Sequence, residues 1–240
     1  MSLIAETGLQ ALFSALPRNN AVRLLTARRL REVFWLGLPV FTAGSLLLLS
    51  GGWWLLGLAG MRYGAADAAP EIAHYGLGLA LGQAVALAYA TARVAPSAYL
   101  DVRHRRTSRE WDALMAMNIN APAVVCTPWL ITGAVTALGF WALYYVLYLA
   151  VEQFYPVLSS WMGISFVPIA SGAFASLPSL LVTLPCAATG GLVAAWVTLA
   201  LATRERISTA GRNAALGLRA FLIALASAGM AQGALYAMLH

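Results

Sequence analysis

The chain has 240 residues, of which 61% are hydrophobic and only 10% are charged, and its mean hydropathy is +0.75. This composition excludes an ordinary soluble domain and indicates a polytopic membrane protein, with a single membrane domain over residues 1–240. The net charge of +6 rests wholly on arginine, because the sequence contains no lysine. In a soluble protein such a charge would suggest nucleic acid. Here the positions of the arginines follow membrane topology, so we expect no nucleic-acid partner.

Residues 1–31 form the first predicted segment. The apolar residues from Leu9 to Leu16 share one helical face, and Glu6 is the only charged residue before Pro17. We therefore expect an interfacial helix on the cytoplasmic side, not a signal peptide. Five arginines follow between Arg18 and Arg31, and they either contact anionic lipid or simply flank the first span.

Two membrane spans are predicted next, over residues 33–60 and 72–97. Paired glycines in the first span permit close helix approach or a bend, and they directly precede Trp53 and Trp54. These tryptophans belong either to an interfacial belt or to the border of a lipid-sized cavity. Residues 62–71 form a short outward loop. The second span is rich in glycine and alanine, which lets helices pack closely in lipid.

The stretch 101–122 carries the densest mixture of opposite charges in the sequence. Its apolar residues Trp111, Leu114, Met115 and Ile119 recur at i, i+3, i+4 and i+8, which predicts a short amphipathic helix on the membrane surface. Asp101 or Ser108 would cap its start, and residues 118–122 would end it. With Trp111, Leu114 and Met115 as apolar anchors and charges around them, this helix suits the groove of a partner protein; a solvated charged loop is the alternative. The candidate docking residues are Asp101, Arg105, Arg106, Arg109, Glu110, Trp111 and Asp112.

Three further spans complete the predicted topology. The third covers residues 123–151, and an uncharged segment, 153–171, follows it against the outer surface. The fourth covers residues 172–203 and contains two prolines that favour a kink. The fifth ends at His240. The expected fold is therefore an all-α membrane protein with an interfacial helix, five transmembrane helices and one charged inner helix between the second and third.

The arginines also predict orientation. Thirteen of the fifteen lie before the first span, between the second and third spans, or around the last turn. The positive-inside rule then places the N-terminus in the cytoplasm, and five crossings place His240 outside. Arg93 lies at the inner end of the second span, where it either pairs with Asp101 or extends to the inner headgroups.

Catalytic and metal chemistry have little support in the sequence. The three histidines are scattered, and Cys126 and Cys186 lie apart in apolar segments without the spacing of metal ligands. No glycine-rich phosphate loop follows a strand, so we do not expect the chain to bind ATP. A hydrolase using Ser165 and His74 is the weakest alternative, since the strained turn that exposes such a serine is missing. We expect no cofactor, no metal and no enzymatic activity.

A family resemblance rests on Arg93, Asp101 and the run 108–122, which reads S-R-E-W-D-A-L-M-A-M-N-I-N-A-P. It resembles the signature of MlaE/YrbE-type permeases, in which an Arg and an acid precede a T-E-Q-(I)-D-A-L-x-x-M-G-V-D-P run. Gly211 and Arg212 are similar to a weaker motif of the family before its last span. The chain departs from the family at residues 79–83, where R-E-L-G-P becomes L-A-L-G-Q.

The resemblance implies a permease subunit of an ABC-type phospholipid transporter in a bacterial inner membrane, with a periplasmic C-terminus. Its implied partners are a separate ATPase, which the 101–122 coupling helix contacts, an MCE-domain protein, a second permease protomer and membrane lipid. Lipid would pass between the first and fifth spans of the two protomers. A non-transporting scaffold that anchors envelope subunits is the alternative. The lipid-path candidates are Trp53, Trp54, Leu56, Tyr63 and Tyr236, and the structural charge corner is Arg93 and Arg212.

Overall fold

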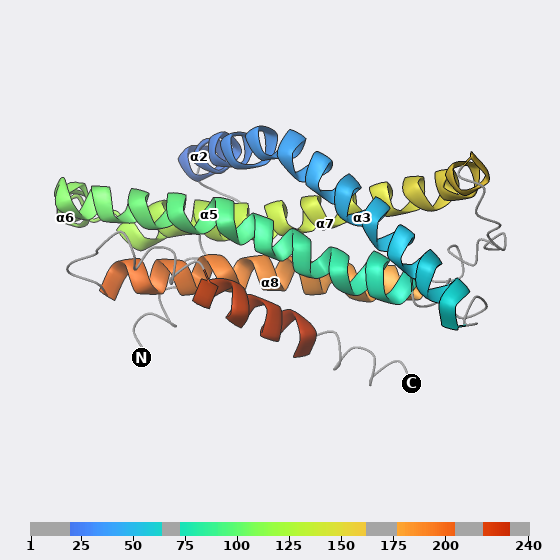
Figure 1. Cartoon of the computed structure of the whole chain (residues 1–240). Coiled ribbons are helices and arrows are strands. Elements are labelled where there is room, and N and C mark those ends of the chain that lie inside the picture. Colours follow the sequence, from blue (N-terminus) through green and yellow to red (C-terminus); the bar gives the residue numbers. More distant parts are fainter. Residues whose placement is uncertain (1–19, 64–72, 162–176, 205–217, 231–240) are drawn as a thin grey trace.

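The computed structural model describes residues 20–63, 73–161, 177–204 and 218–230. The described elements are all helices (Figure 1), in agreement with the predicted fold class. The predicted interfacial helix before Pro17 lies outside the described residues, as do Arg212 and Tyr236. Of the predicted outward loop 62–71, Arg62 and Tyr63 belong to the end of α3, and the rest lies outside the described residues.

The first long helix is continuous but changes its winding. It comprises α2 (Asn20–Leu30), the π-helical turn η1 (Arg31–Trp35) and α3 (Leu36–Tyr63). Pro39 in α3 has no N–H for the carbonyl of Trp35, so the π turn and the proline weaken the same part of the helix. In Figure 1, α3 descends at an angle from α2.

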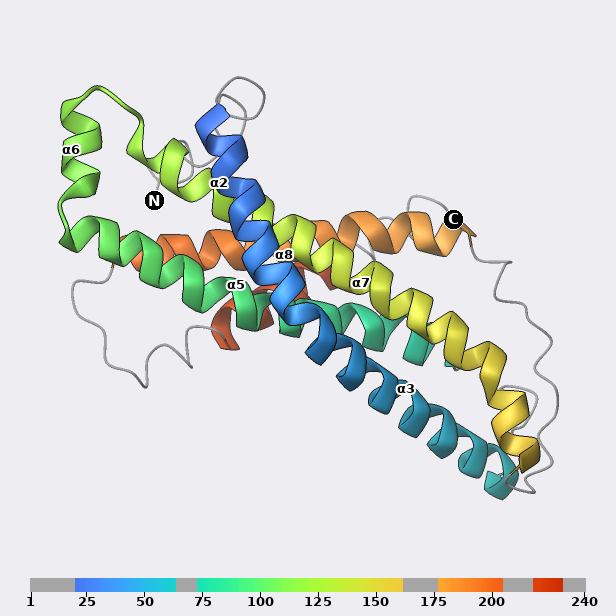
Figure 2. The ribbon, with the colours of Figure 1, turned by 90° about the horizontal axis from the view of Figure 1, so that it is seen from above.

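The buried positions of this helix recur every four residues, including Arg29, Val33, Phe41, Leu49 and Trp53. An i+4 row is inclined to the helix axis, so a helix that packs through such a row crosses its neighbours obliquely. Figure 2 shows α2 and α3 running across the rest of the bundle in this way. The other faces of the helix stay exposed within the protomer.

Three helices form the centre of the bundle. The second long helix consists of the π-helical η3 (Ala73–Leu81) and α5 (Gly82–Thr107), and it packs against α7 (Ala121–Trp161) and α8 (Leu177–Arg204). At the crossing of α7 and α8, a Cβ on Gly133 or Gly191 would collide with the backbone carbonyl of the other glycine. Close approach of this kind is how helices associate in lipid, where van der Waals contact replaces the hydrophobic effect.

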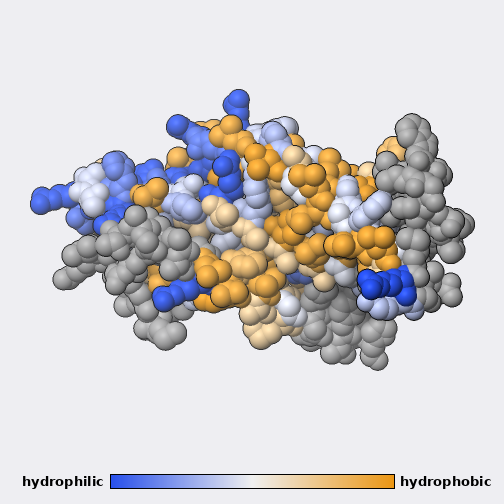
Figure 3. All heavy atoms as spheres, viewed as in Figure 1, coloured by the Kyte–Doolittle hydropathy of each residue, from blue (hydrophilic) through white to orange (hydrophobic). Residues whose placement is uncertain are grey.

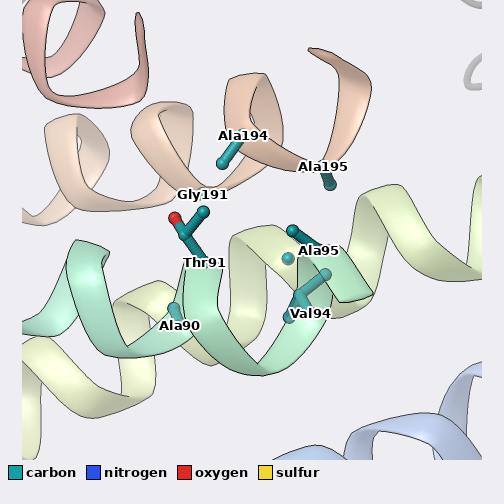
Figure 4. A pocket seen from close by; sticks show the side chains of 8 residues that line it. Ala90, Thr91, Val94, Ala95, Gly191, Ala194 and Ala195 are labelled. Atoms are coloured by element: carbon teal, nitrogen blue, oxygen red, sulfur yellow. The ribbon is translucent and has the colours of Figure 1, made fainter. Parts of the chain in front are cut away.

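Small side chains continue this close packing between α5 and α8. Ala90, Val94, Ala194 and Ala195 surround a gap too narrow for a water molecule, and Thr91 is its polar member (Figure 4). Aromatic side chains of α3 and α7 form another part of the core, with Phe41, Trp53, Phe140, Trp141, Tyr144 and Tyr148 in one buried cluster.

Four described helices are long and apolar enough to cross a membrane: Val22–Ala59, Ala73–Thr107, Ala121–Phe154 and Thr183–Thr203. They follow the order of the first four predicted spans. A shorter apolar helix, Leu218–Met230, lies where the fifth span was expected. Hydrophilic residues gather at the end of the molecule that carries α2 and the charged connection between α5 and α7, and hydrophobic residues cover its middle (Figure 3). This distribution agrees with a membrane protein.

Candidate functional site

The charged stretch 101–122 is not one helix, in contrast to the prediction. Residues 101–107 complete α5, and a separate seven-residue helix, α6 (Glu110–Ala116), follows a turn at Ser108 and Arg109. Arg109 has φ of 59°, in the left-handed region that costs a non-glycine residue about 1–2 kcal/mol. Neither Asp101 nor Ser108 caps α6, since Arg109 occupies the N-cap position without a side-chain hydrogen bond.

A second turn with positive φ closes the other end of α6. Asn118 has φ of 59°, a conformation that asparagine tolerates better than most residues. Asn120 then starts α7, because its side-chain Oδ1 accepts a hydrogen bond of 3.2 Å from the N–H of Ala123. The predicted turn after residue 117 is therefore present. Figure 2 shows α6 crosswise to the ends of α5 and α7.

Asp101 is the centre of the charged end of the bundle. Its Oδ2 accepts hydrogen bonds from Arg29 Nη2 of α2 at 2.8 Å and from Trp129 Nε1 of α7 at 3.1 Å. Its Oδ1 accepts one from Arg105 Nε at 3.3 Å, one turn along α5. The Arg29 guanidinium also lies 4.1 Å from the centroid of the Trp129 ring, a cation–π contact. One carboxylate therefore joins three helices.

Two arginines attach α6 to this centre. Arg105 Nη1 donates to Glu110 Oε2 at 3.2 Å, so the same guanidinium bridges Asp101 of α5 and Glu110 of α6. Arg106 donates to the backbone carbonyl of Thr203 near the end of α8, and its guanidinium lies 5.6 Å from the centroid of the Trp111 ring. A cation at the C-terminal carbonyls of α8 is also favoured by the helix dipole. The predicted docking residues thus include several that hold the protomer together.

The surface that α6 offers to a partner differs from the predicted one. Trp111 and Leu114 turn inward and pack on the buried cluster around Val102 and Trp129, so they are not free anchors. Met115, which was also expected as an anchor, is 56% exposed. The exposed side chains in and around α6 include Arg109, Glu110, Asp112, Met115, Met117 and Ile119. A charged rim around flexible methionines is a surface that can adapt to a partner.

Arg93 does not pair with Asp101. The two residues are eight positions apart on one continuous helix, a rise of about 12 Å, which is beyond the reach of an ion pair. The partner of Asp101 across the bundle is Arg29, which the sequence analysis treated only as part of a basic flank. The available signal in the sequence was its four-residue spacing from Val33, Gly37 and Phe41, which would share one helical face with it. Nothing in the sequence around Trp129 indicated its contact with Asp101.

The lipid-path candidates separate into buried and exposed residues. Trp53 is only 1% exposed and stacks on Tyr148, with ring centroids 6.2 Å apart, so it belongs to the aromatic cluster and faces neither a lipid belt nor a cavity. Leu56 packs against the same cluster. Trp54 is 39% exposed and Tyr63 is 77% exposed, and both remain open to lipid or to a partner.

Within the described residues, no group of three or more His, Cys, Asp and Glu side chains could hold a metal ion. Cys126 and Cys186 are free thiols, and Cys186 is buried. A scan against protein-family models gives no match for the chain, and a comparison with curated proteins gives none either.

Proposed function

We propose that the chain is the transmembrane permease subunit of an ABC-type lipid transporter in a bacterial inner membrane. It works as a homodimer or heterodimer with a separate ATPase and an MCE-domain protein, and it moves phospholipid or another hydrophobic substrate. The proposal starts from the resemblance of Arg93, Asp101 and residues 108–122 to MlaE/YrbE-type permeases. The structure contributes one observation that supports it.

That observation is the connection between α5 and α7. A simple loop would be solvated and free of the bundle, whereas α6 is a separate helix tied to α5 by Arg105 and Glu110 and packed on the core through Trp111. Its outer face keeps Asp112 and Met115 exposed. A short helix held to two spans can transmit the movement of an attached ATPase as a rigid-body tilt, which is the role of a coupling helix.

The proposed topology keeps the N-terminus in the cytoplasm and the C-terminus in the periplasm. Hydrophilic residues gather at the end of the molecule that carries α2 and α6 (Figure 3), and the sequence places arginines in α2, in the last two turns of α5 and directly before α6. That end is assigned to the cytoplasm by the positive-inside rule. Leu218–Met230 is then part of the fifth crossing. Lipid passes near the exposed residues Trp54 and Tyr63 of the first span. Trp53 is no longer a lipid-path candidate, because its side chain is buried.

A non-transporting scaffold that assembles envelope subunits is the second candidate. It is favoured by residues 79–83, where the family's charged motif is replaced by apolar residues and Gln83, and where Leu79, Gly82 and Gln83 are buried in the bundle. A second span that is packed and uncharged at residues 79–83 suits a structural role as well as a transporting one.

Co-purification separates the two candidates. The chain carrying an affinity tag is purified from its native membrane in mild detergent, its partners are identified by mass spectrometry, and the complex is placed in phospholipid vesicles. The transporter predicts an ATPase and an MCE-domain protein in the complex, and lipid exchange that depends on ATP. A stable complex without an ATPase would reject the transporter in favour of the scaffold.

A further inference from the structure

Four charged side chains form a continuous series across the cytoplasmic end of the bundle. Glu110 of α6 bonds Arg105 of α5, Arg105 bonds Asp101, and Asp101 bonds Arg29 of α2. We call this series the charge chain. It joins α6 to the first long helix through Arg105 and Asp101, without a direct contact between Glu110 and α2. The two carboxylates balance the two arginines, so the charge chain is neutral as a whole.

The first long helix is held at two points on either side of its π turn. Before the turn, Arg29 is bound by Asp101, and its side chain is only 10% exposed. After the turn, the hydroxyl of Tyr89 in α5 donates to the carbonyl of Gly37 at 2.9 Å. Between these two points lies η1, Arg31–Trp35, and Pro39 follows closely. A π turn and a proline are the features at which helices bend.

The end of the charge chain opposite to α2 is α6, which lies between two turns with positive φ, at Arg109 and Asn118. Displacement of α6 removes Glu110 from Arg105. The remaining charge chain then has two arginines for one carboxylate, and the repulsion between Arg105 and Arg29 is no longer balanced. We expect α2 to move in response to that repulsion, because Val22 and Arg29 are the only buried side chains among those of α2 whose burial the structure describes.

We propose that the position of α6 sets the bend of the first long helix through the charge chain, with Asp101 as its positioning residue. The link from α6 to the first long helix would carry the movement of the ATPase into the membrane, and this part of the inference rests on the proposed function. In the transporter, movement of α6 by the ATPase would release or tighten α2 and so change the angle of α3, whose exposed end carries Tyr63. The structural relation itself concerns this chain alone.

The test measures the distance between α2 and α5 in the purified chain, without an ATPase. Spin labels are attached to Ala27→Cys and Leu100→Cys, two exposed positions, after replacement of both native cysteines by alanine, and the protein is placed in phospholipid nanodiscs. Glu110→Gln breaks the charge chain at its far end from α2. We expect the distribution to shift to longer distances and to broaden, and we expect the same of Asp101→Asn. The double variant should match Asp101→Asn alone, because both changes interrupt one series.

Two controls separate transmission from general loosening. Glu110→Asp keeps the charge and should restore the distribution of the parent chain. Arg28→Gln removes the neighbouring exposed pair with Glu32 and should leave it unchanged. A parent-like distribution in Glu110→Gln would overturn the proposal, whether or not Asp101→Asn folds, and so would additive shifts in the double variant. Failure of the proposed function appears elsewhere, in the co-purification, because no ATPase takes part in this measurement.

Discussion

Two neighbouring arginines show how much the environment decides at the scale of the residue. Arg28 pairs with Glu32 on the surface of α2, and the two side chains are 79% and 56% exposed. Arg29 lies on the buried face of α2, where it forms an ion pair with Asp101 and a cation–π contact with the Trp129 ring. Solvent screens the first pair, whereas removal of one partner of the second leaves a carboxylate in a poorly solvated position.

The first prediction follows from this contrast. Arg29→Gln should destabilise the protein by an amount near the lower end of the ~3–5 kcal/mol typical of a broken buried pair, since Asp101 keeps Arg105 and Trp129. Arg28→Gln should cost at most about 0.5 kcal/mol. Thermal unfolding of both variants in the same detergent measures the difference. Equal midpoints for the two would contradict the central place of Arg29.

Glycines of this protein also differ in how closely their surroundings pack against them. The backbones at Gly133 and Gly191 leave no room for a Cβ, but nothing lies within 4 Å of a Cβ added to Gly44. The second prediction is that Gly191→Ala lowers the unfolding temperature, because α7 and α8 must separate. Gly44→Ala should raise the stability by up to ~1 kcal/mol, the helix propensity that glycine lacks. A gain of stability in Gly191→Ala would show that the crossing is looser than described.

At the scale of the element, α6 has an inner face that holds the protomer and an outer face that is free. The sequence pattern of Trp111, Leu114 and Met115 described an apolar stripe but could not say which side the bundle would cover. Trp111 and Leu114 are covered, because the last turns of α5 and the start of α7 converge beneath them. Substitution of these two would disturb folding and docking together.

The third prediction therefore uses the outer face. Asp112→Arg combined with Met115→Glu should weaken retention of the ATPase at least about tenfold, since reversed charge at an interface costs several kcal/mol. Pull-down in detergent measures retention, and size-exclusion chromatography checks the fold. Arg62→Glu, an exposed reversal at the other end of α3, is the control. Full retention by the double variant would reject α6 as the docking element.

At the scale of the whole molecule, charge and hydropathy define two ends and a middle. Labels in the turn between α5 and α6 and in the last third of α7 test the orientation. The fourth prediction is that Gln153→Cys is labelled by an impermeant thiol reagent from outside, and Ser108→Cys only from the cytoplasmic side, in a background without native cysteines. Both positions are exposed, so access to solvent does not limit the reaction. Labelling of Ser108→Cys from outside would reverse the topology and remove α6 from the ATPase.

The fifth prediction concerns the lipid path. A photo-crosslinker at Tyr63 or Trp54 in the assembled complex should capture lipid in an amount that changes with ATP turnover. Val146 of α7, which is 61% exposed, is the control for contact with bulk lipid. Capture that equals the control and ignores ATP would mean that these aromatic residues only anchor the protein. Trp53 should capture none, because its side chain is buried in the aromatic cluster between α3 and α7.

The sequence by itself determined the class of the protein and the order of its spans. Long uncharged segments have one low-energy solution in a bilayer, the helix, because every backbone N–H and C=O must be satisfied internally. The positions of the arginines predicted which ends of the spans face the cytoplasm. Charge density also located the segment between the second and third spans, since nowhere else in the sequence do opposite charges lie so close together. These are one-dimensional properties, and each depends on a stretch of neighbouring residues.

Only the tertiary structure decided which side chains contact one another. Arg29 and Asp101 are 72 residues apart, and only the crossing of the first long helix over the bundle brings them to 2.8 Å. The division of 101–122 into the end of α5 and a separate α6 depends on Arg109, a residue that gives no turn signal and whose positive φ is offset by the contacts of α6. Trp53 and Trp54 are adjacent in sequence, yet the helix places one in the core and the other outside. Contacts between distant segments have no local signature, because their energy is gained only after the helices have packed.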